Sequence, residues 1–157
     1  MEKYVFDTNS LLKLQSYSND VFTSLWDEIE KLISQSRFIS TREVLNELES
    51  YKDDNYIVKW GKNNSLFEQP SKDEIKILRD EIFSVKHFRT SIKPKKIKKG
   101  KPVADPFLIA KAKVEDGILI TEERYRRNSV QIPNICNSLG VECTNLDGMM
   151  EKEGWEF

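Results

Sequence analysis

The sequence predicts an α/β protein, a three-layer α/β/α sandwich with a mainly parallel, Rossmann-like central sheet. Short β-prone runs alternate with helical periodicity along most of the chain. Residues 118–121 are apolar without alternation, which is typical of a strand buried on both faces of a parallel sheet. The length of 157 residues, 38% of them hydrophobic, suits one compact domain. We therefore expect a single domain, 1–157, with a helical and basic-loop insertion at about 52–101.

The first half of the chain predicts two strands, each followed by a helix. Residues 4–6 form a strand, and the next helix begins after the turn or capping cluster 7–10. Residues 21–33 have helical spacing, and 38–40 form the second strand. Ser40 and Glu43 fit a capping box for a helix that carries Val44, Leu45, Leu48 and Tyr51. Residues 52–70 give only turn signals, so no element is assigned there.

The second half predicts three helices and two strands. Ser71 and Glu74 cap a helix whose core face holds Ile75, Leu78, Ile82 and Phe83. Asp105 is expected as the N-cap of a buried helix, with Pro106 at its first position. The strand 118–121 follows. A helix then runs from Ile132 to Leu139, Gly140 ends it, and 141–144 form the last short strand.

The charge is unevenly distributed. Residues 86–101 hold eight of the 25 Lys and Arg and no acid, which leaves 17 cations against 26 acids elsewhere. This basic segment is either a solvated loop or a contact for a polyanion. If it contacts phosphates, Lys98→Ala should reduce the salt dependence of binding to a polyanion. With no signal peptide and no apolar run of spanning length, a cytoplasmic protein is expected.

Several kinds of site are disfavoured by composition. Cys136 and Cys143 lack the spacing of a zinc knuckle and have no histidine nearby, so free thiols are expected. His87 is the one histidine in the chain, which makes a nucleophilic triad a poor interpretation.

Acids follow the predicted strands. Asp7 ends the first strand, Glu122 and Glu123 follow the strand 118–121, and Asp105 begins the buried helix. Glu47 lies in the helix after the second strand. Sites in parallel sheets form beyond the carboxyl ends of the strands, so these acids are expected to converge. Carboxylates that share a cleft need a cation, and oxygen ligands suit Mg²⁺ or Mn²⁺.

Each acid also has an ordinary explanation. Asp7 and Asp105 are good helix caps, and Glu43 has a capping role available. Glu47 and Glu49 flank the same apolar stripe, so periodicity does not choose between them. Glu122 and Glu123 could be surface charges on a turn. Only the joint placement of the acids favours a metal site.

Four blocks of the sequence, in order, resemble the PIN domain, a metal-dependent nuclease fold found in many bacterial toxin ribonucleases and in uncharacterised PIN-like proteins. The blocks are 4–12, 38–48, 104–110 and 118–123. Their acids are Asp7, Glu47, Asp105 and Glu123, the last in place of the usual aspartate. The middle of the chain, about 52–101, is longer than the corresponding part of the smallest PIN domains.

The resemblance implies an endoribonuclease that hydrolyses RNA phosphodiester bonds with Mg²⁺ or Mn²⁺. Asp7 and Asp105 would be direct ligands, and Glu47 and Glu123 would be further ligands or would hold water. The side chains of Thr8, Asn9 and Thr121 would orient these carboxylates. The basic segment would supply phosphate contacts from its lysines, Lys93, Lys95, Lys96, Lys98, Lys99 and Lys101. An antitoxin partner and a homodimer are also implied.

Two other functions are open. The first is a non-catalytic module of the same fold that binds RNA or an antitoxin. The second is a small metal-dependent phosphohydrolase of the haloacid dehalogenase or receiver type. Proteins of the haloacid dehalogenase type usually have an acid two residues after the first aspartate, where this chain has Asn9. Proteins of the receiver type have paired acids before the first strand.

Overall fold

The sheet predicted from the sequence is present in the computed structural model, which describes residues 1–51, 55–86, 104–128 and 131–157. The described strands are β1 (Tyr4–Phe6), β2 (Phe38–Thr41), β3 (Phe67–Glu68), β4 (Ile118–Ile120) and β5 (Cys143–Thr144). They form one five-stranded sheet in the order β3-β2-β1-β4-β5, and every described pairing is parallel. The three-layer α/β/α prediction is therefore confirmed.

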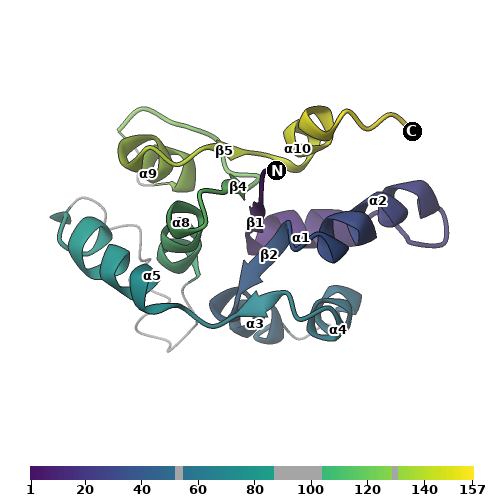
Figure 1. The fold of residues 1–157 in the computed structure, drawn as a ribbon, viewed down its shortest axis with the longest axis horizontal. Coiled ribbons are helices and arrows are strands. Elements are labelled where there is room, and N and C mark those ends of the chain that lie inside the picture. The colour runs from purple at the N-terminus through teal and green to yellow at the C-terminus, as the bar shows by residue number, and fades with distance from the viewer. Residues whose placement is uncertain (52–54, 87–103, 129–130) are drawn as a thin grey trace.

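Helices lie on both sides of this sheet (Figure 1). Those of the first half are α1 (Thr8–Gln15), α2 (Thr23–Ser34), α3 (Arg42–Glu49) and α4 (Tyr56–Asn63). Those of the second half are α5 (Lys72–Ile77) with its π-helical continuation η1 (Leu78–Ile82), α8 (Asp105–Val114), α9 (Ile132–Leu139) and α10 (Leu146–Glu153). Among the described residues, no helix is long and apolar enough to cross a bilayer.

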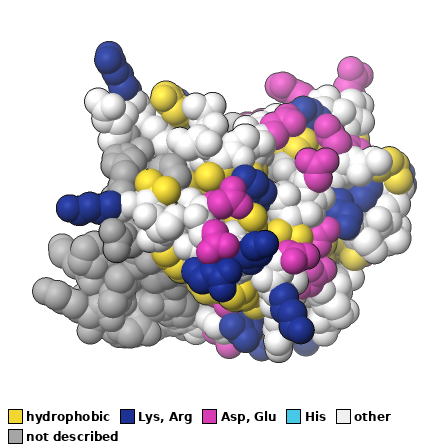
Figure 2. All heavy atoms as spheres, turned by 60° about the vertical axis from the view of Figure 1, so that its left-hand side comes forward, with side chains coloured by type: hydrophobic (Ala, Val, Ile, Leu, Met, Phe, Trp, Pro, Cys, Tyr) yellow, Lys and Arg dark blue, Asp and Glu magenta, His cyan; other side chains and the backbone are white. Residues whose placement is uncertain are grey.

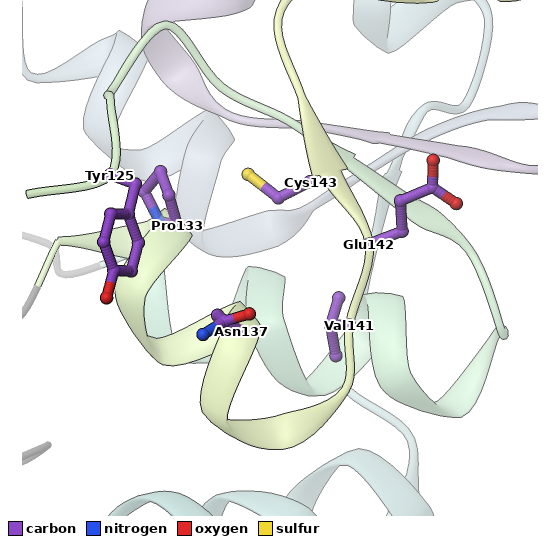
Figure 3. A pocket seen from close by; sticks show the side chains of 6 residues that line it. All are labelled: Tyr125, Pro133, Asn137, Val141, Glu142 and Cys143. Carbon is purple, nitrogen blue, oxygen red and sulfur yellow. The ribbon is translucent and has the colours of Figure 1, made fainter.

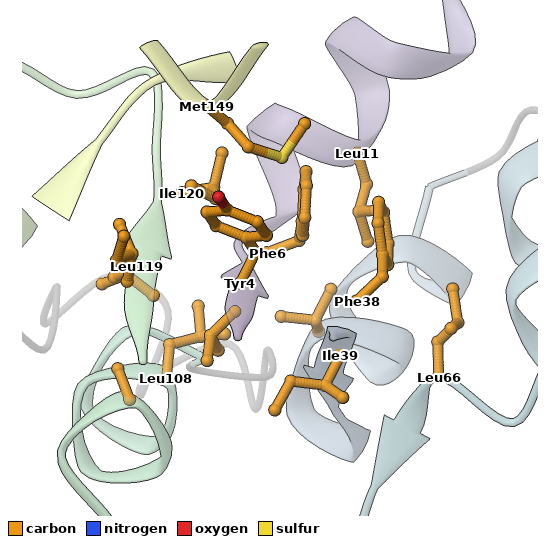
Figure 4. Close-up of a cluster of buried hydrophobic side chains, with 14 of the residues drawn as sticks. Tyr4, Phe6, Leu11, Phe38, Ile39, Leu66, Leu108, Leu119, Ile120 and Met149 are labelled. Atoms are coloured by element: carbon orange, nitrogen blue, oxygen red, sulfur yellow. The ribbon is translucent and has the colours of Figure 1, made fainter. Parts of the chain in front are cut away.

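The core occupies both faces of the central strands (Figure 4). On one face Phe6 stacks on Phe38 with ring centroids 3.9 Å apart, near Leu11 of α1 and Met149 of α10. Leu108 of α8 lies against the other face. Burial of β1 and β4 on both faces explains why their sequences show no alternation.

Two predicted helix caps are wrong by one residue. Thr41, not Ser40, caps α3 through Val44 N, because the Ser40 hydroxyl donates instead to the carbonyl oxygen of Phe6. Ala104, not Asp105, is the N-cap of α8, and Asp105 is its first helical residue. The capping box of Ser71 and Glu74 on α5 is confirmed.

Some apolar residues do not lie where periodicity placed them. Ile75 is 47% exposed, and Leu78 and Ile82 are buried. Val21 is exposed before α2 begins, and Tyr51 is exposed beyond the end of α3. The last strand is shorter than predicted, and α10 was not assigned from the sequence.

Residues 55–70 hold a helix and an edge strand that local sequence did not predict. The helix α4 depends on tertiary contacts, because the side-chain oxygen of Gln15 accepts a hydrogen bond from Ile57 N at 2.8 Å. Trp60 packs edge-on against Trp26 and Phe38, with ring centroids 5.1 and 5.7 Å away. A short element held by distant partners has a weak local signal.

Candidate active site at the carboxyl edge of the sheet

The carboxyl ends of three neighbouring strands are joined by hydrogen bonds. The Ser40 hydroxyl at the end of β2 donates to Phe6 O of β1 at 2.8 Å. Asp7 N donates to Ile120 O of β4 at 3.1 Å, and the Ser10 hydroxyl donates to the same oxygen at 3.0 Å. Residues that follow β1, β2 and β4 therefore meet at one edge, where sites in parallel sheets form.

Asp7 is the most constrained acid at this edge. It is 4% exposed and is the N-cap of α1, where its carboxylate accepts a hydrogen bond from Ser10 N at 2.7 Å. Burial raises the pKa of Asp7 to about 6, although hydrogen bonds with Thr121 and Ser10 oppose the shift. The negative charge of Glu123 adds to the rise in this pKa. Asp7 therefore caps its helix, and the charge of a second carboxylate also acts on it.

Glu123, whose charge acts on Asp7, is held by two hydrogen bonds. Its Oε2 accepts a hydrogen bond from Ile132 N, at the start of α9, at 2.9 Å. Its backbone N donates to the Thr121 hydroxyl at 3.1 Å, and Thr121 also bonds to Asp7. The structure thus brings together three of the residues named from the sequence, Asp7, Thr121 and Glu123.

Glu122 serves a different purpose. Its Oε1 accepts from Leu146 N, the first residue of α10, at 3.1 Å, and its Oε2 pairs with Lys13 at 3.3 Å. Neither Glu122 nor Glu123 is a free surface charge on a turn. The two consecutive glutamates hold the starts of two different helices.

Asp105 is placed at the same edge by the direction of α8. The far end of this helix leads into Gly117 and Ile118, and Ile118 N bonds to Lys3 O at the opposite edge of the sheet. A helix of ten residues rises about 15 Å, so its first residue returns to the carboxyl edge. The cap at Ala104 removes the explanation of Asp105 as an N-cap.

The helix α3 contributes two acids from its first two turns. Glu47, the acid named from the sequence, is half-buried. Glu43 is buried; its Oε1 pairs with Arg42 at 2.9 Å, and its Oε2 has no hydrogen-bond partner among the described residues. Sequence reasoning assigned Glu43 to a capping box and so missed a buried acid in the first turn of α3, just past the end of β2. Because Glu43 fits the capping-box pattern, its sequence position alone did not indicate a site residue.

The remaining predicted residues have separate positions. Thr8 is buried, and its hydroxyl has no hydrogen-bond partner in the described part of the chain, whereas Asn9 is exposed. The predicted RNA-contacting lysines (Lys93, Lys95, Lys96, Lys98, Lys99 and Lys101) lie outside the described residues. His87 does too.

The donor chemistry fits a hard cation, but the described side chains do not form a complete site. Asp7 and Glu123 supply carboxylate oxygens, with hydroxyl groups of Thr8 and Thr121 nearby in sequence and no sulfur or imidazole ligand among them. Such donors suit Mg²⁺ or Mn²⁺. Within the described ranges, no group of three or more Asp, Glu, His or Cys side chains lies close enough to hold a metal ion.

The fold and this edge define a class, an α/β protein whose parallel sheet carries buried acids beyond its carboxyl ends. The chain belongs to the family described as Domain of unknown function (DUF4411), which matches residues 4–157. No curated protein and no solved structure gives a significant match to the chain.

Proposed function

We propose that this protein is a metal-dependent endoribonuclease that uses the acids at the carboxyl edge to hydrolyse RNA phosphodiester bonds. The observation that carries the proposal is that the buried Asp7 and Glu123 lie beyond the ends of the adjacent strands β1 and β4, where the charge of Glu123 raises the pKa of Asp7. The four sequence blocks that resemble the PIN domain supply the reaction type. Their acids are distributed over this same edge and the helices that begin there.

A cation explains why two carboxylates are kept together. Ionised Asp7 is unfavourable in its buried position, and Glu123 makes it more so. Mg²⁺ or Mn²⁺ would be held by Asp7 and Asp105, with Glu47 and Glu123 as further ligands or holders of water. When bound, such a cation lowers the pKa of water and neutralises charge on a phosphodiester.

The protein's own groups would fix the acids before any cation binds. Ser10 N and the Thr121 hydroxyl orient the Asp7 carboxylate, and Ile132 N fixes one oxygen of Glu123. Held carboxylates lose little freedom on binding a ligand, so the arrangement favours a defined geometry over a loose acidic surface.

A non-catalytic RNA- or antitoxin-binding module is the second candidate. It is favoured by one observation, that the described acids do not form a ready-made group of three. The phosphohydrolase alternative is weaker, because the position two residues after Asp7 is the exposed Asn9. A toxin–antitoxin role and a homodimer rest on the resemblance alone and stay predictions.

Calorimetric titration with Mn²⁺ tests the cation site without requiring the correct RNA. Wild type should bind Mn²⁺, and Asp7→Asn should weaken binding by tenfold or more, about the loss expected when a ligand is removed. Glu49→Gln is the matched control, because the exposed Glu49 pairs with Lys62 on the neighbouring helix. Equal affinities for all three proteins would rule out Asp7 as a ligand.

A further inference from the structure

A basic and aromatic loop follows the acid pair. Residues 124–128 hold Arg124, Tyr125, Arg126 and Arg127, and all four side chains are exposed, Tyr125 by 60%. Within the described ranges none of these three arginines forms an ion pair, whereas Lys13, Arg37 and Lys111 all do. Figure 2 shows acidic and basic side chains lying next to one another on one face of the protein. The exposed Lys59, Lys72 and Lys76 likewise form no ion pair within the described ranges, so the distinguishing feature of this loop is the grouping of three arginines around a tyrosine.

The backbone of this loop is held in place. Asn134 of α9 is almost fully buried, and its Oδ1 accepts a hydrogen bond from Arg126 N at 3.2 Å. Its Nδ2 donates to Arg126 O. Glu123, at the start of the loop, is fixed by Ile132 N. A loop fixed at these points presents its arginines at a smaller cost in conformational entropy than a free one.

Tyr125 also borders a hollow. The hollow has a volume of about 480 Å³ and is lined by Tyr125, Pro133, Asn137, Val141, Glu142 and Cys143 (Figure 3). The ring of Tyr125 and the amide of Asn137 lie on one side, with Cys143 across from them. A flat ring, an amide and apolar walls are the features that receive an unstacked nucleobase.

One wall of the hollow carries a thiol that interacts with a second, buried thiol. Cys143 lines the hollow and interacts with the Sγ of Cys136, and this contact, together with burial, raises the pKa of the Cys136 thiol. The charge of Glu123 also acts on Cys136, and Glu123 in turn acts on Asp7. The loop joins the two features along the chain, because Arg124 directly follows Glu123 and Tyr125, the next residue, lines the hollow.

We propose that the loop 124–128 binds a single-stranded segment of RNA, with its arginines on phosphates and an unpaired base stacked on Tyr125 over the hollow. The inference rests on the proposed function in one respect, that the bound strand is the one that reaches Asp7 and Glu123. Arginine suits phosphate because its planar guanidinium donates two parallel hydrogen bonds. A tyrosine ring between arginines can stack on any base, so the site is expected to prefer single-stranded RNA but to have little preference for its base sequence.

The test is equilibrium binding of a fluorescent single-stranded RNA in EDTA, so that cleavage plays no part. The triple variant Arg124→Gln, Arg126→Gln, Arg127→Gln should weaken binding about tenfold or more. It should also reduce the slope of log affinity against log salt by about 2, since each phosphate contact on a single strand contributes about 0.7. Its control is Lys59→Gln, Lys72→Gln, Lys76→Gln, which removes the same charge from exposed positions of α4 and α5 and should leave the slope unchanged.

Substitution of the tyrosine separates stacking from charge. Tyr125→Ala should weaken binding by about fivefold to a hundredfold, and Tyr125→Phe should retain it, because the ring remains. Neither change affects a buried side chain, so folding is preserved. An unchanged RNA affinity and salt slope in the triple arginine variant would overturn the proposal. Binding of the same variant to phosphatidylserine vesicles would also be measured. If the variant lost binding to the vesicles but still bound RNA as wild type does, the proposal would likewise be wrong.

The outcome is distinguishable from failure of the proposed function. If Asp7→Asn binds the RNA as wild type does and the arginine variant does not, the loop is the binding site whether or not the protein cuts. If the protein cuts RNA and the arginine variant binds and cuts normally, the nuclease stands and this inference is wrong.

Discussion

The amino group of Lys111 lies 2.8 Å from the carboxylate of Glu74, and only 2% and 3% of these side chains are exposed. Lys111 also pairs with Glu68 of the edge strand β3 at 2.8 Å. Glu74 in turn accepts a hydrogen bond from Ser71 N, which completes the capping box of α5. One buried lysine thus joins α8, the helix that begins with Asp105, to α5 and β3.

Removal of this lysine should destabilise the fold strongly. Lys111→Met leaves Glu74 buried without its cation, which is expected to cost about 3–5 kcal/mol in the free energy of unfolding. Lys113→Met on the same helix is the control, because Lys113 and its partner Glu81 are about one-third exposed and such pairs contribute less than about 1 kcal/mol. Urea unfolding measures the free energy of unfolding of both variants. Equal losses would show that the buried pair stabilises the fold no more than the partly exposed one.

Ionisation of Asp7 should lower the stability of the metal-free protein. Its pKa rises from 3.8 when unfolded to about 6 when folded, so the folded state binds more protons between these values. Stability from this group is therefore greatest below pH 4 and is lost as the pH rises to 6, by roughly 3 kcal/mol. Asp7→Asn removes this loss, so the variant should gain stability relative to wild type as the pH rises. Urea unfolding in EDTA at pH 4 and pH 7 measures the gain, and a difference that does not change with pH would contradict the expectation.

Glu43 should contribute to cation binding despite its absence from the sequence-based site. Its buried Oε2 has no hydrogen-bond partner in the described structure, and Glu43 lies in the first turn of α3, just past the end of β2. We expect Glu43→Gln to weaken Mn²⁺ binding by about tenfold, as losses of supporting groups around metals do. The same titration of Glu47→Gln tests the acid that the resemblance implies. Unchanged Mn²⁺ affinity in Glu43→Gln would reduce Glu43 to a local partner of Arg42.

The fold was predictable where local and tertiary signals agree. The strands at 4–6 and 118–120 are apolar because helices cover both faces of the sheet, and α9 ends at Gly140 because that residue is left-handed, with a φ of 70°. The helix α4 could not be predicted, since its start depends on Gln15 and its packing on Trp26. The exposure of Ile75 also depends on a tertiary contact. The side of α5 that faces the interior carries Glu74, which pairs with Lys111, and the neighbouring Ile75 lies on another side of the helix.

The site was predictable in part, for a topological reason. Acids that follow parallel strands must share an edge, and in the structure the charge of Glu123, which follows β4, acts on the buried Asp7, which follows β1. The hydrogen bond from Ile132 to Glu123 and the anchoring of the arginine loop by Asn134 depend on α9, whose position no local pattern encodes. The separate roles of Glu122 and Glu123, which lie beyond the end of β4, depend on the starts of α10 and α9 that they contact.

RNA cleavage tests the central claim most directly. Mixed structured and single-stranded RNAs would be incubated with wild type and Mg²⁺ or Mn²⁺, with wild type and EDTA, and with Asp105→Asn and metal. Circular dichroism would confirm that the variant folds. We expect cutting by wild type that is lost both in EDTA and in Asp105→Asn. Cutting that persists in Asp105→Asn, or no cutting by wild type with either metal, would contradict the assignment of a metal-dependent nuclease to this edge of the sheet.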